Sequence, residues 1–289
     1  MKINNIIPST SVFTNKLISV NPSPENLFYM GSIPQNRTPS IAVVGTRKPT
    51  RYGTEVTERL VFDLAKYGII IISGLALGVD SIAHRTALEA NGTTLAVVVN
   101  TLPDISPRSN IPLAKQIINS GGAIISEYGP GHDANIGKYS FLQRNRLVSG
   151  LADAVLITEA SAKSGTLNTA SHALTQGKEV FVVPGNITSP LSEGCNNLLK
   201  QGATPVTEAR DIIEVVAPEL LTTDKQTPLP LGDSPAESSI LQLLATGIRD
   251  GEQLQASSGL SVADFSTALT MLEINGFIKP LGANQWTIK

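Results

Sequence analysis

The chain has 289 residues, of which 41% are hydrophobic, enough to bury one large core and a smaller second one. Its formal charge of −2 at pH 7 excludes the globally basic surface of many nucleic-acid binders, so any such binding has to come from local clusters of cations. Cys195 is the only cysteine, which excludes a disulfide framework and a cysteine-based zinc site and is typical of a reducing compartment.

The first 36 residues hold only short apolar pieces, notably residues 26–31 (NLFYMG). We expect residues 1–36 to form an extension that packs on the core. Pro8 and polar neighbours interrupt this segment before it could form the apolar region of a signal peptide, and no apolar run in the chain reaches about 18 residues. We therefore expect a cytoplasmic protein that has no contact with a membrane.

Between residues 41 and 216, apolar strand-like runs alternate with helix-like segments. The predicted strands are residues 41–45, 68–74, 93–99, 123–126, 154–158 and 179–185. Segments with helical spacing, such as residues 52–68, lie between most of them, which is the order of βαβ units. Unbroken apolar runs such as residues 154–158 are typical of strands buried on both faces of a parallel sheet. The pattern predicts an α/β fold with a Rossmann-like, doubly wound and mostly parallel sheet over residues 37–216.

A change of composition after residue 216 predicts a second domain. Residues 217–235 carry four prolines and little apolar periodicity, which indicates a linker. Beyond it, residues 237–247, 250–259 and 261–278 have helical spacing, and residues 278–289 contain two strand-like stretches around a Gly-Ala-Asn turn. This order predicts a small winged-helix domain over residues 236–289.

The charge of the predicted winged helix bears on what it binds. Residues 234–289 hold three cations against five carboxylates, and the helix that would read DNA, within residues 261–276, has no cation. Phosphate contacts dominate the affinity of proteins for duplex DNA. We therefore favour a protein-interaction or regulatory role, with duplex reading by a transcription regulator as the alternative.

A basic loop follows the first core strand. Its candidate residues are Gly45, Thr46, Arg47, Lys48 and Arg51. Open α/β sheets bind ligands at the carboxyl ends of their strands, so cations in this loop predict an anion site. Glycine at the strand ends, here and at Gly74 after the next strand, lets the backbone approach a ligand closely. The alternative is a solvated basic loop.

A second group of cations lies in residues 141–146 (FLQRNR). Arg144 and Arg146, with Asn145 between them, are candidates because a planar guanidinium group donates two hydrogen bonds to a phosphate. The alternative is that the two arginines pair with carboxylates such as Glu127 or Glu159. The phenylalanine that opens this segment could stack on a base, but we assign it to the core.

The third candidate is the turn between the strand at 154–158 and the helix that follows. It comprises Lys163, Ser164, Gly165 and Thr166. A helix N-terminus presents unpaired backbone N–H groups and the positive end of the helix dipole, and the lysine adds a mobile positive charge. The turn is not a P-loop, because its lysine precedes its glycine, and no strand leads into a dinucleotide-binding G-x-G-x-x-G. We expect no cofactor.

The sequence has no recognisable catalytic centre. Asp80 stands at an expected helix N-cap and His84 one turn later, and we interpret them as a cap and a packed side chain rather than an acid–base pair. His132 and His172 have no ligand spacing with His84, so no metal site is expected, and Cys195 has no assignable base. We expect a binding protein and not an enzyme.

Several motifs in one order resemble the DNA-processing protein A family (DprA, also called Smf) over residues 26–203, with a family-type winged helix at the end. They are GTRKPTRYG (45–53), SGLALGVDSIAHRTAL (73–88), SEYGPG (126–131), FLQRNRLVSGLADAVLITEASAKSGTLNTASHAL (141–174), VPGN (183–186) and GCNNLLKQGA (194–203). The resemblance implies an extended Rossmann core that binds single-stranded DNA, dimerises through that core, and loads RecA onto incoming strands during natural transformation. It also implies that Thr46 and Arg47, the arginines of residues 144–146, and residues 163–166 line the strand-binding pocket.

The chain departs from the family in residues 98–110, which lack the family's glycines and tyrosine but keep Asp104, Pro107 and Asn110. The core also resembles nucleotide phosphoribohydrolases of the LOG, or lysine decarboxylase-like, type, whose P-G-G-x-G-T-x-x-E motif aligns on residues 162–169. Thr169 stands where that motif has its catalytic glutamate, which favours a binder over a hydrolase. A nucleotide-binding enzyme or sensor of this type is the alternative function.

Overall fold

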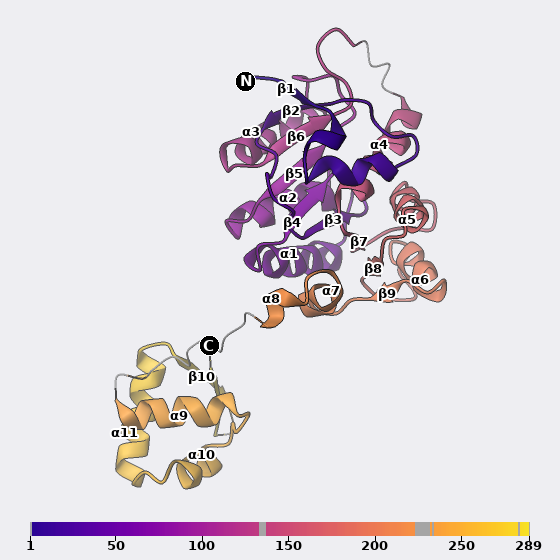
Figure 1. Ribbon diagram of the computed structural model, residues 1–289. Coiled ribbons are helices and arrows are strands. Elements are labelled where there is room, and N and C mark those ends of the chain that lie inside the picture. Colours follow the sequence, from indigo (N-terminus) through magenta and orange to yellow (C-terminus); the bar gives the residue numbers. More distant parts are fainter. Residues whose placement is uncertain (1, 133–136, 223–231, 233, 283, 289) are drawn as a thin grey trace. The chain divides into compact units, whose positions relative to one another are not determined.

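The chain divides into two compact units, Met1–Leu221 and Thr222–Lys289. The computed structural model describes residues 2–132, 137–222, 232, 234–282 and 284–288 (Figure 1). The predicted linker at 217–235 includes the short helix α8 (Glu219–Thr222), and its residues 223–231 and 233 lie outside the described residues.

The larger unit is built around a sheet that has nine strands in the described residues. In chain order they are β1 (Asn4–Ile6), β2 (Leu27–Gly31), β3 (Ser40–Val44), β4 (Ile70–Ser73), β5 (Thr94–Val97), β6 (Ala123–Ser126), β7 (Ala154–Ile157), β8 (Val180–Val182) and β9 (Thr204–Pro205). Their order across the sheet is β1-β2-β6-β5-β4-β3-β7-β8-β9. The pairs β1–β2 and β2–β6 are antiparallel and all other pairs are parallel, which confirms the predicted mostly parallel, doubly wound sheet.

The six strands predicted from apolar runs are all present, as β3 to β8. The prediction missed β1 and β9, which have three and two residues and are too short to show a periodicity. It also missed that residues 27–31 pair as β2 with β6. The N-terminal segment therefore extends the sheet as well as packing on the core.

Helices cover both faces of the sheet. They are α1 (Arg51–Lys66), α2 (Val79–Glu89), α3 (Ile111–Asn119), α4 (Lys138–Leu151), α5 (Thr166–Thr175), α6 (Glu193–Lys200) and α7 (Ala209–Val216), with short 3-10 helices η1 (Pro8–Thr10), η2 (Thr14–Ser19) and η3 (Arg108–Asn110). α1, α2, α3 and α7 pack on one face, and η2, α4, α5 and α6 pack on the other (Figure 1). Among the described residues, every helix is too short or too polar to cross a membrane.

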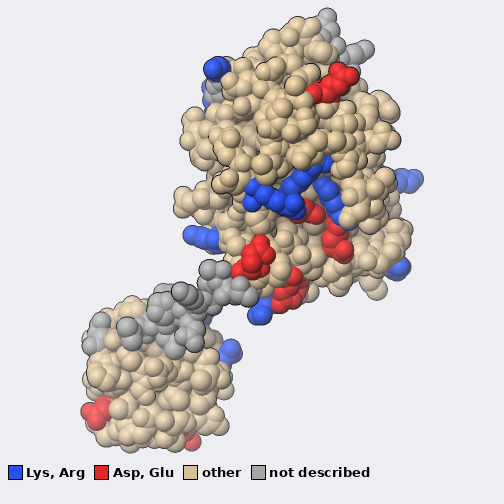
Figure 2. All heavy atoms as spheres, in the orientation of Figure 1, with Lys and Arg blue, Asp and Glu red and all other residues tan. Residues whose placement is uncertain are grey.

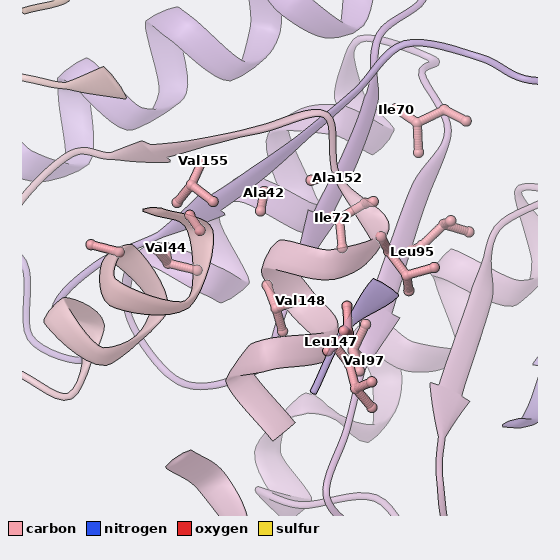
Figure 3. Close-up of a cluster of buried hydrophobic side chains, with 14 of the residues drawn as sticks. Ala42, Val44, Ile70, Ile72, Leu95, Val97, Leu147, Val148, Ala152 and Val155 are labelled. Carbon is pink, nitrogen blue, oxygen red and sulfur yellow. The ribbon is translucent and has the colours of Figure 1, made fainter. Parts of the chain in front are cut away.

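Alternation along each strand explains why the sheet is buried on both faces. In β7, Val155 and Ile157 pack under α4 and α5, whereas Ala154 and Leu156 pack under α1. Figure 3 shows Leu147 of α4 among the side chains of the strands on the first of these faces. Burying an aliphatic side chain of this kind contributes roughly 1.5–3 kcal/mol, so these two layers fix where the strand ends and their loops lie.

The smaller unit has the predicted winged-helix layout. It consists of α9 (Pro235–Ala245), α10 (Gly251–Ser258), α11 (Val262–Ile274), β10 (Ile278–Gly282) and β11 (Gln285–Ile288), and β10 pairs with β11 in an antiparallel hairpin. Ser234, Asp250 and Ser261 cap the three helices by accepting hydrogen bonds from backbone N–H groups. Residue 283, in the predicted turn, lies outside the described residues.

Charged side chains are distributed unevenly over the two units. Figure 2 shows Lys and Arg side chains gathered in a hollow of the larger unit with Asp and Glu side chains beside them, whereas the visible face of the smaller unit carries few charges. Local clustering of cations is thus compatible with the net charge of −2.

Candidate nucleic-acid interface

A cavity of about 630 Å³ lies where the chain reverses its direction across the sheet. From β3 the chain moves outward through β4, β5 and β6, and it then returns to β7 on the other side of β3. Connections from two such strands leave toward opposite faces of the sheet, and ligands bind in the crevice between them. The residues that line the cavity are Val44, Gly45, Thr46, Arg47, Ala76, Asp80, Phe141, Leu142, Arg144, Asn145, Ser164, Gly165, Thr166 and Thr169.

Glu159, just after β7, holds the loop between β3 and α1. Its carboxylate accepts hydrogen bonds from the backbone N–H (2.8 Å) and the hydroxyl (2.7 Å) of Thr50, and its carbonyl oxygen accepts one from the N–H of Thr46 (2.8 Å). The absence of a side chain at Gly45 is required, because a Cβ there would lie 2.6 Å from Cγ2 of Val79. Glu159 is thus committed to this loop and not to an arginine.

Arg47 and Phe141 form one wall of the cavity. Arg47 is exposed, and its guanidinium carbon lies 5.4 Å from the centre of the Phe141 ring, a cation–π contact. Phe141 is half-buried and lines the cavity, so its assignment to the core was wrong. The sequence could not place it, because the direction of this side chain depends on how α4 is rotated over the sheet.

Arg144 supplies a buried cation at the cavity. Only 7% of its surface is exposed, and Nη1 donates to the carbonyl oxygen of Val97 at 2.6 Å. Its guanidinium group lies directly against Gly74, where a Cβ would collide with Nη1. Burial lowers the pKa of Arg144, and Asp80 opposes this effect. Gly74 therefore serves the site by making room for Arg144.

Asp80 does not cap α2, contrary to the prediction, since the N-cap is Gly78. Its Oδ2 accepts hydrogen bonds from the N–H groups of Gly74 (3.1 Å) and Ala76 (3.4 Å), which fixes the loop between β4 and α2. Burial raises the pKa of Asp80, whereas Arg144 and the two N–H groups act in the opposite direction. Asp80 thus places a carboxyl group in the wall of a site rich in cations.

His84 packs as predicted. It is fully buried, and its Nδ1 lies 2.6 Å from Oγ1 of Thr94, which itself donates to the carbonyl oxygen of Ile71. Nδ1 is therefore the protonated nitrogen. Burial lowers the pKa of His84 to about 3, so the ring is neutral at neutral pH.

The start of α5 forms the opposite wall. Ser164, Gly165 and Thr166 line the cavity, as predicted for an anion site at a helix N-terminus. Ser164 Oγ accepts from the N–H of Thr166 at 3.2 Å, and Asn145 bonds to Asn168 at 3.3 Å, which ties α4 to α5. The Ser164 hydroxyl donates in turn to Oγ1 of Thr166 at 2.9 Å, so hydrogen bonds within the turn hold this wall of the cavity together.

Arg146 does not take part in the cavity. It is 3% exposed, and its guanidinium donates to both oxygens of Glu127 (2.6 and 2.9 Å) and to the carbonyl oxygen of Pro22 (3.0 Å). The predicted DNA contact by Arg146 does not fit this geometry, and the alternative of a carboxylate partner is correct. Arg144 and Arg146 are two residues apart on α4, so they point to different sides of the helix.

Three further predicted residues surround the cavity without lining it. Lys48, Arg51 and Lys163 are exposed, and none has an ion pair with another described residue. Lys48 follows Arg47 on the loop into α1, Arg51 is the first residue of α1, and Lys163 lies in the turn before α5 begins at Thr166. The site thus has a buried cation inside and exposed cations on the segments that border it.

The segment that departs from the family, residues 98–110, still supports the cavity. Asn110 is 1% exposed, and its Nδ2 donates to the carbonyl oxygens of Leu75 (2.9 Å) and Ala76 (3.3 Å). Asp104, in contrast, is exposed. Asn110 therefore stabilises the same loop as Asp80 does, through carbonyl oxygens instead of N–H groups. The sequence could not show this role, because the partners of Asn110 are 34 and 35 residues away.

Within the described part of the chain, no group of three or more His, Cys, Asp or Glu side chains is placed to hold a metal ion. Cys195 is buried, and burial raises the pKa of its thiol to about 11.

A family model described as DNA recombination-mediator protein A matches residues 4–217, and one described as DprA winged helix domain matches residues 208–284. The chain belongs to the DNA recombination-mediator protein A family. The first match includes every strand from β1 to β9 and the whole lining of the cavity. The second covers most of the smaller unit and agrees with its winged-helix fold.

Curated relatives in this family are similar over most of the larger unit. The chain is 42% identical to protein Smf of Escherichia coli over 212 residues, which are 73% of this chain and 56% of that protein. It is 37% identical to DprA of Streptococcus pneumoniae over 191 residues, 66% of each chain. The match thus spans little more than half the length of the E. coli relative.

Two solved structures of the family share the fold. The crystal structure of DprA from Streptococcus pneumoniae superposes with a TM-score of 0.66 at 33% identity, covering 75% of each chain. DprA from Helicobacter pylori, whose structure was reported for its single-stranded DNA-binding mode, superposes with a TM-score of 0.65 at 34% identity and covers 77% of this chain and 97% of that one.

Proposed function

We propose that this protein is a recombination mediator that binds single-stranded DNA in the cavity between β3 and β7 and along the loops that border it. The observation that carries the proposal is the set of cations without a carboxylate partner at this edge. Arg47, Lys48, Arg51 and Lys163 have no ion pair among the described residues, and they surround a cavity that contains the buried Arg144. The single-stranded DNA binding reported for the H. pylori relative supports the same choice of ligand.

The chemistry of the cavity suits a DNA strand. A phosphate can accept hydrogen bonds from the fork of Arg47 and from the N–H of Gly165, which donates to no other described residue. The Phe141 ring with the guanidinium above it offers a flat surface to a base. A cavity of about 630 Å³ admits a nucleotide that protrudes from a flexible strand, whereas the paired bases of a rigid duplex stay outside. We therefore expect preference for single strands.

We propose a binder in preference to a hydrolase of the LOG type. Thr169, at the place of that family's catalytic glutamate, is 2% exposed and carries no acid or base. The carboxylate that does line the cavity, Asp80, already accepts two backbone N–H groups. Incubation with nucleoside monophosphates, followed by chromatography for the free base, tests this point, and we expect no release.

We further propose, from membership of the family, that the protein forms a homodimer through the larger unit, protects incoming DNA and loads RecA during natural transformation. Analytical ultracentrifugation tests the dimer. For loading, RecA filament formation is followed on single-stranded DNA precovered with single-strand-binding protein, and we expect it to be faster in the presence of this protein. Unchanged filament kinetics would contradict a loading role.

The central test of DNA binding is fluorescence anisotropy with a labelled oligonucleotide and its duplex at several salt concentrations. We expect tighter binding of the single strand, little dependence on sequence, and affinity that falls steeply with salt because phosphate contacts release counterions. Equal affinity for both forms, or no binding at low salt, would contradict the proposed function.

A further inference from the structure

A carboxyl group stands in the wall of the cavity that we assign to an anionic strand. Asp80 is 7% exposed, lines the cavity and interacts electrostatically with both Arg144 and Arg47. A negative charge at this place repels phosphate groups. If the cavity holds a DNA strand, on which everything said here of Asp80 rests, its charge has to offset this repulsion by a second effect on the site.

The guanidinium group of Arg144 is only partly held by hydrogen bonds. Nη1 donates to the carbonyl oxygen of Val97 at 2.6 Å, but Nε is buried without a partner and Nη2 has no hydrogen bond to a described residue. A buried cation is costly unless an anion or hydrogen-bond acceptors compensate it. No carboxylate oxygen of a described residue lies within 4 Å of this guanidinium group, and the charge of Asp80 acts on it from beyond that distance.

Asp80 also fixes the surface on which this guanidinium group lies. The Arg144 group rests against Gly74, and Asp80 accepts the N–H groups of Gly74 and Ala76 at the end of β4. If this loop moved, the backbone at Gly74 that supports the guanidinium group of Arg144 would move with it. One carboxylate thus compensates the buried charge and holds the backbone that shapes its place.

We propose that Asp80 is a positioning residue that keeps Arg144 directed into the cavity, so that tight binding of single-stranded DNA requires this negative charge. Asp80 does not touch the strand. It acts by holding Arg144 with its Nη2 available to a phosphate oxygen, at the cost of some repulsion of the same phosphate. Removal of the charge of Asp80 would lower the affinity by releasing Arg144 and would raise it by relieving the repulsion of phosphate. The sign of the measured change therefore tests the proposal.

The test is a double-mutant cycle with Asp80→Asn and Arg144→Met, which removes the positive charge, measured by anisotropy with a single-stranded oligonucleotide. Asparagine has the same shape and retains an oxygen acceptor for the two N–H groups, and Asp63→Asn removes the same charge at an exposed position of α1 as a matched control. We expect D80N to weaken binding about tenfold, as for loss of a nearby opposite charge in a poorly solvated site. We expect D63N to bind as the wild type does or slightly more tightly.

If Asp80 acts through Arg144, D80N weakens binding in the wild-type background but has little effect when Arg144 is already replaced by the uncharged methionine. Binding by D80N that is equal to or tighter than that of the wild type would overturn the proposal, since this is the result expected when Asp80 only repels phosphate. Fully additive effects of the two substitutions would overturn it as well.

A second measurement does not need DNA. The Nε–Hε signal of Arg144 in a ¹⁵N NMR spectrum, assigned by its loss in R144M, should exchange slowly with solvent in the wild type and at least about tenfold faster in D80N. An unchanged signal would overturn the proposal. Failure of the wild type to bind any single strand would instead contradict the proposed function, and the NMR result would still decide whether Asp80 positions Arg144.

Discussion

Lysine and arginine side chains have different roles at the two edges of the central sheet. The parallel strands begin at the amino edge and end at the carboxyl edge. At the amino edge, Lys178 donates to the carbonyl oxygens of Ser149 (2.8 Å), Gly150 (2.6 Å) and Ala152 (2.6 Å), which end α4. Lys16 bonds nearby to Asp153 at 2.7 Å and to the carbonyl oxygen of Leu151 at 3.3 Å. These ammonium groups stabilise the negative end of a helix.

At the carboxyl edge, Arg144 and Arg146 have protein acceptors, but four other cations lack such partners. Arg47 faces an aromatic ring, and Lys48, Arg51 and Lys163 have no ion pair among the described residues. The number of cations therefore does not identify a nucleic-acid site. What distinguishes the two groups is whether protein acceptors already occupy the donors, as they do for Lys16 and Lys178 but not for the four cations beside the cavity.

The largest expected effect is on stability, from the substitution Lys178→Met. The carbonyl oxygens of Gly150 and Ala152 lose their donor and that of Ser149 keeps only the N–H of Ala152, so we expect the free energy of unfolding to fall by about 2 kcal/mol. Because this edge does not bind DNA in our account, the folded variant should retain its affinity for a single strand within about twofold. Urea denaturation measures the stability and anisotropy measures the affinity. A large loss of affinity would show that the amino edge also contributes to DNA binding.

Next in size is the effect of Arg47→Ala on binding. We expect affinity for a single-stranded oligonucleotide to fall about tenfold, or about 1.4 kcal/mol. Stability should not change, because the Arg47 side chain is exposed and has no ion pair with another described residue. The matched control is Arg37→Ala at the amino edge, where the arginine side chain is 75% exposed and lies 3.7 Å from Asp153. Similar losses in the two variants would show that the edges do not differ.

A smaller effect concerns the pH dependence of stability and tests whether water is excluded from the buried side chain of His84, one turn after Asp80 on α2. The pKa of His84 is about 3 in the folded protein against an ordinary value of 6.5, so in this range the unfolded chain binds more protons and stability falls as pH falls. Between pH 6.5 and 5.5 this group should remove about 1 kcal/mol. Denaturation curves of the wild type and His84→Gln should show this difference in pH dependence, and identical slopes would contradict a neutral, buried His84.

The smallest expected effect comes from removing the winged helix. Deleting residues 234–289 should change affinity for single-stranded DNA by no more than about twofold, since α11 carries no Lys or Arg. Anisotropy with the same oligonucleotide measures this. Abolished binding would favour the alternative of a transcription regulator that binds DNA through its winged helix.

Much of the fold could be predicted because its strands are unbroken apolar runs. β7, for example, is buried at all four positions, and such runs separated by helical spacing leave few arrangements other than a doubly wound sheet. The edge strands β1 and β9 could not be predicted, since they are defined by their pairing rather than by a pattern of their own.

The site was predicted less evenly. Backbone positions that end strands, such as Gly45 and Thr46, were placed correctly because every parallel strand points its carboxyl end to the same edge. The side chains of α4 were not placed correctly. The direction of Arg146 depends on its ion pair with Glu127, 19 residues away, and that of Phe141 depends on how the helix is rotated over the sheet. Glu159 could have been recognised as a support, since it follows β7 at the same edge as Thr50.

The most direct test of the central claim is to find where a single strand touches the protein. An oligonucleotide that carries bromodeoxyuridine is cross-linked by ultraviolet light, and the attached peptides are identified by mass spectrometry. The account predicts cross-links in the segments that line the cavity, above all the peptide that contains Phe141. Cross-links confined to η2 or to the loops at the amino edge, around Lys16 and Lys178, would contradict it.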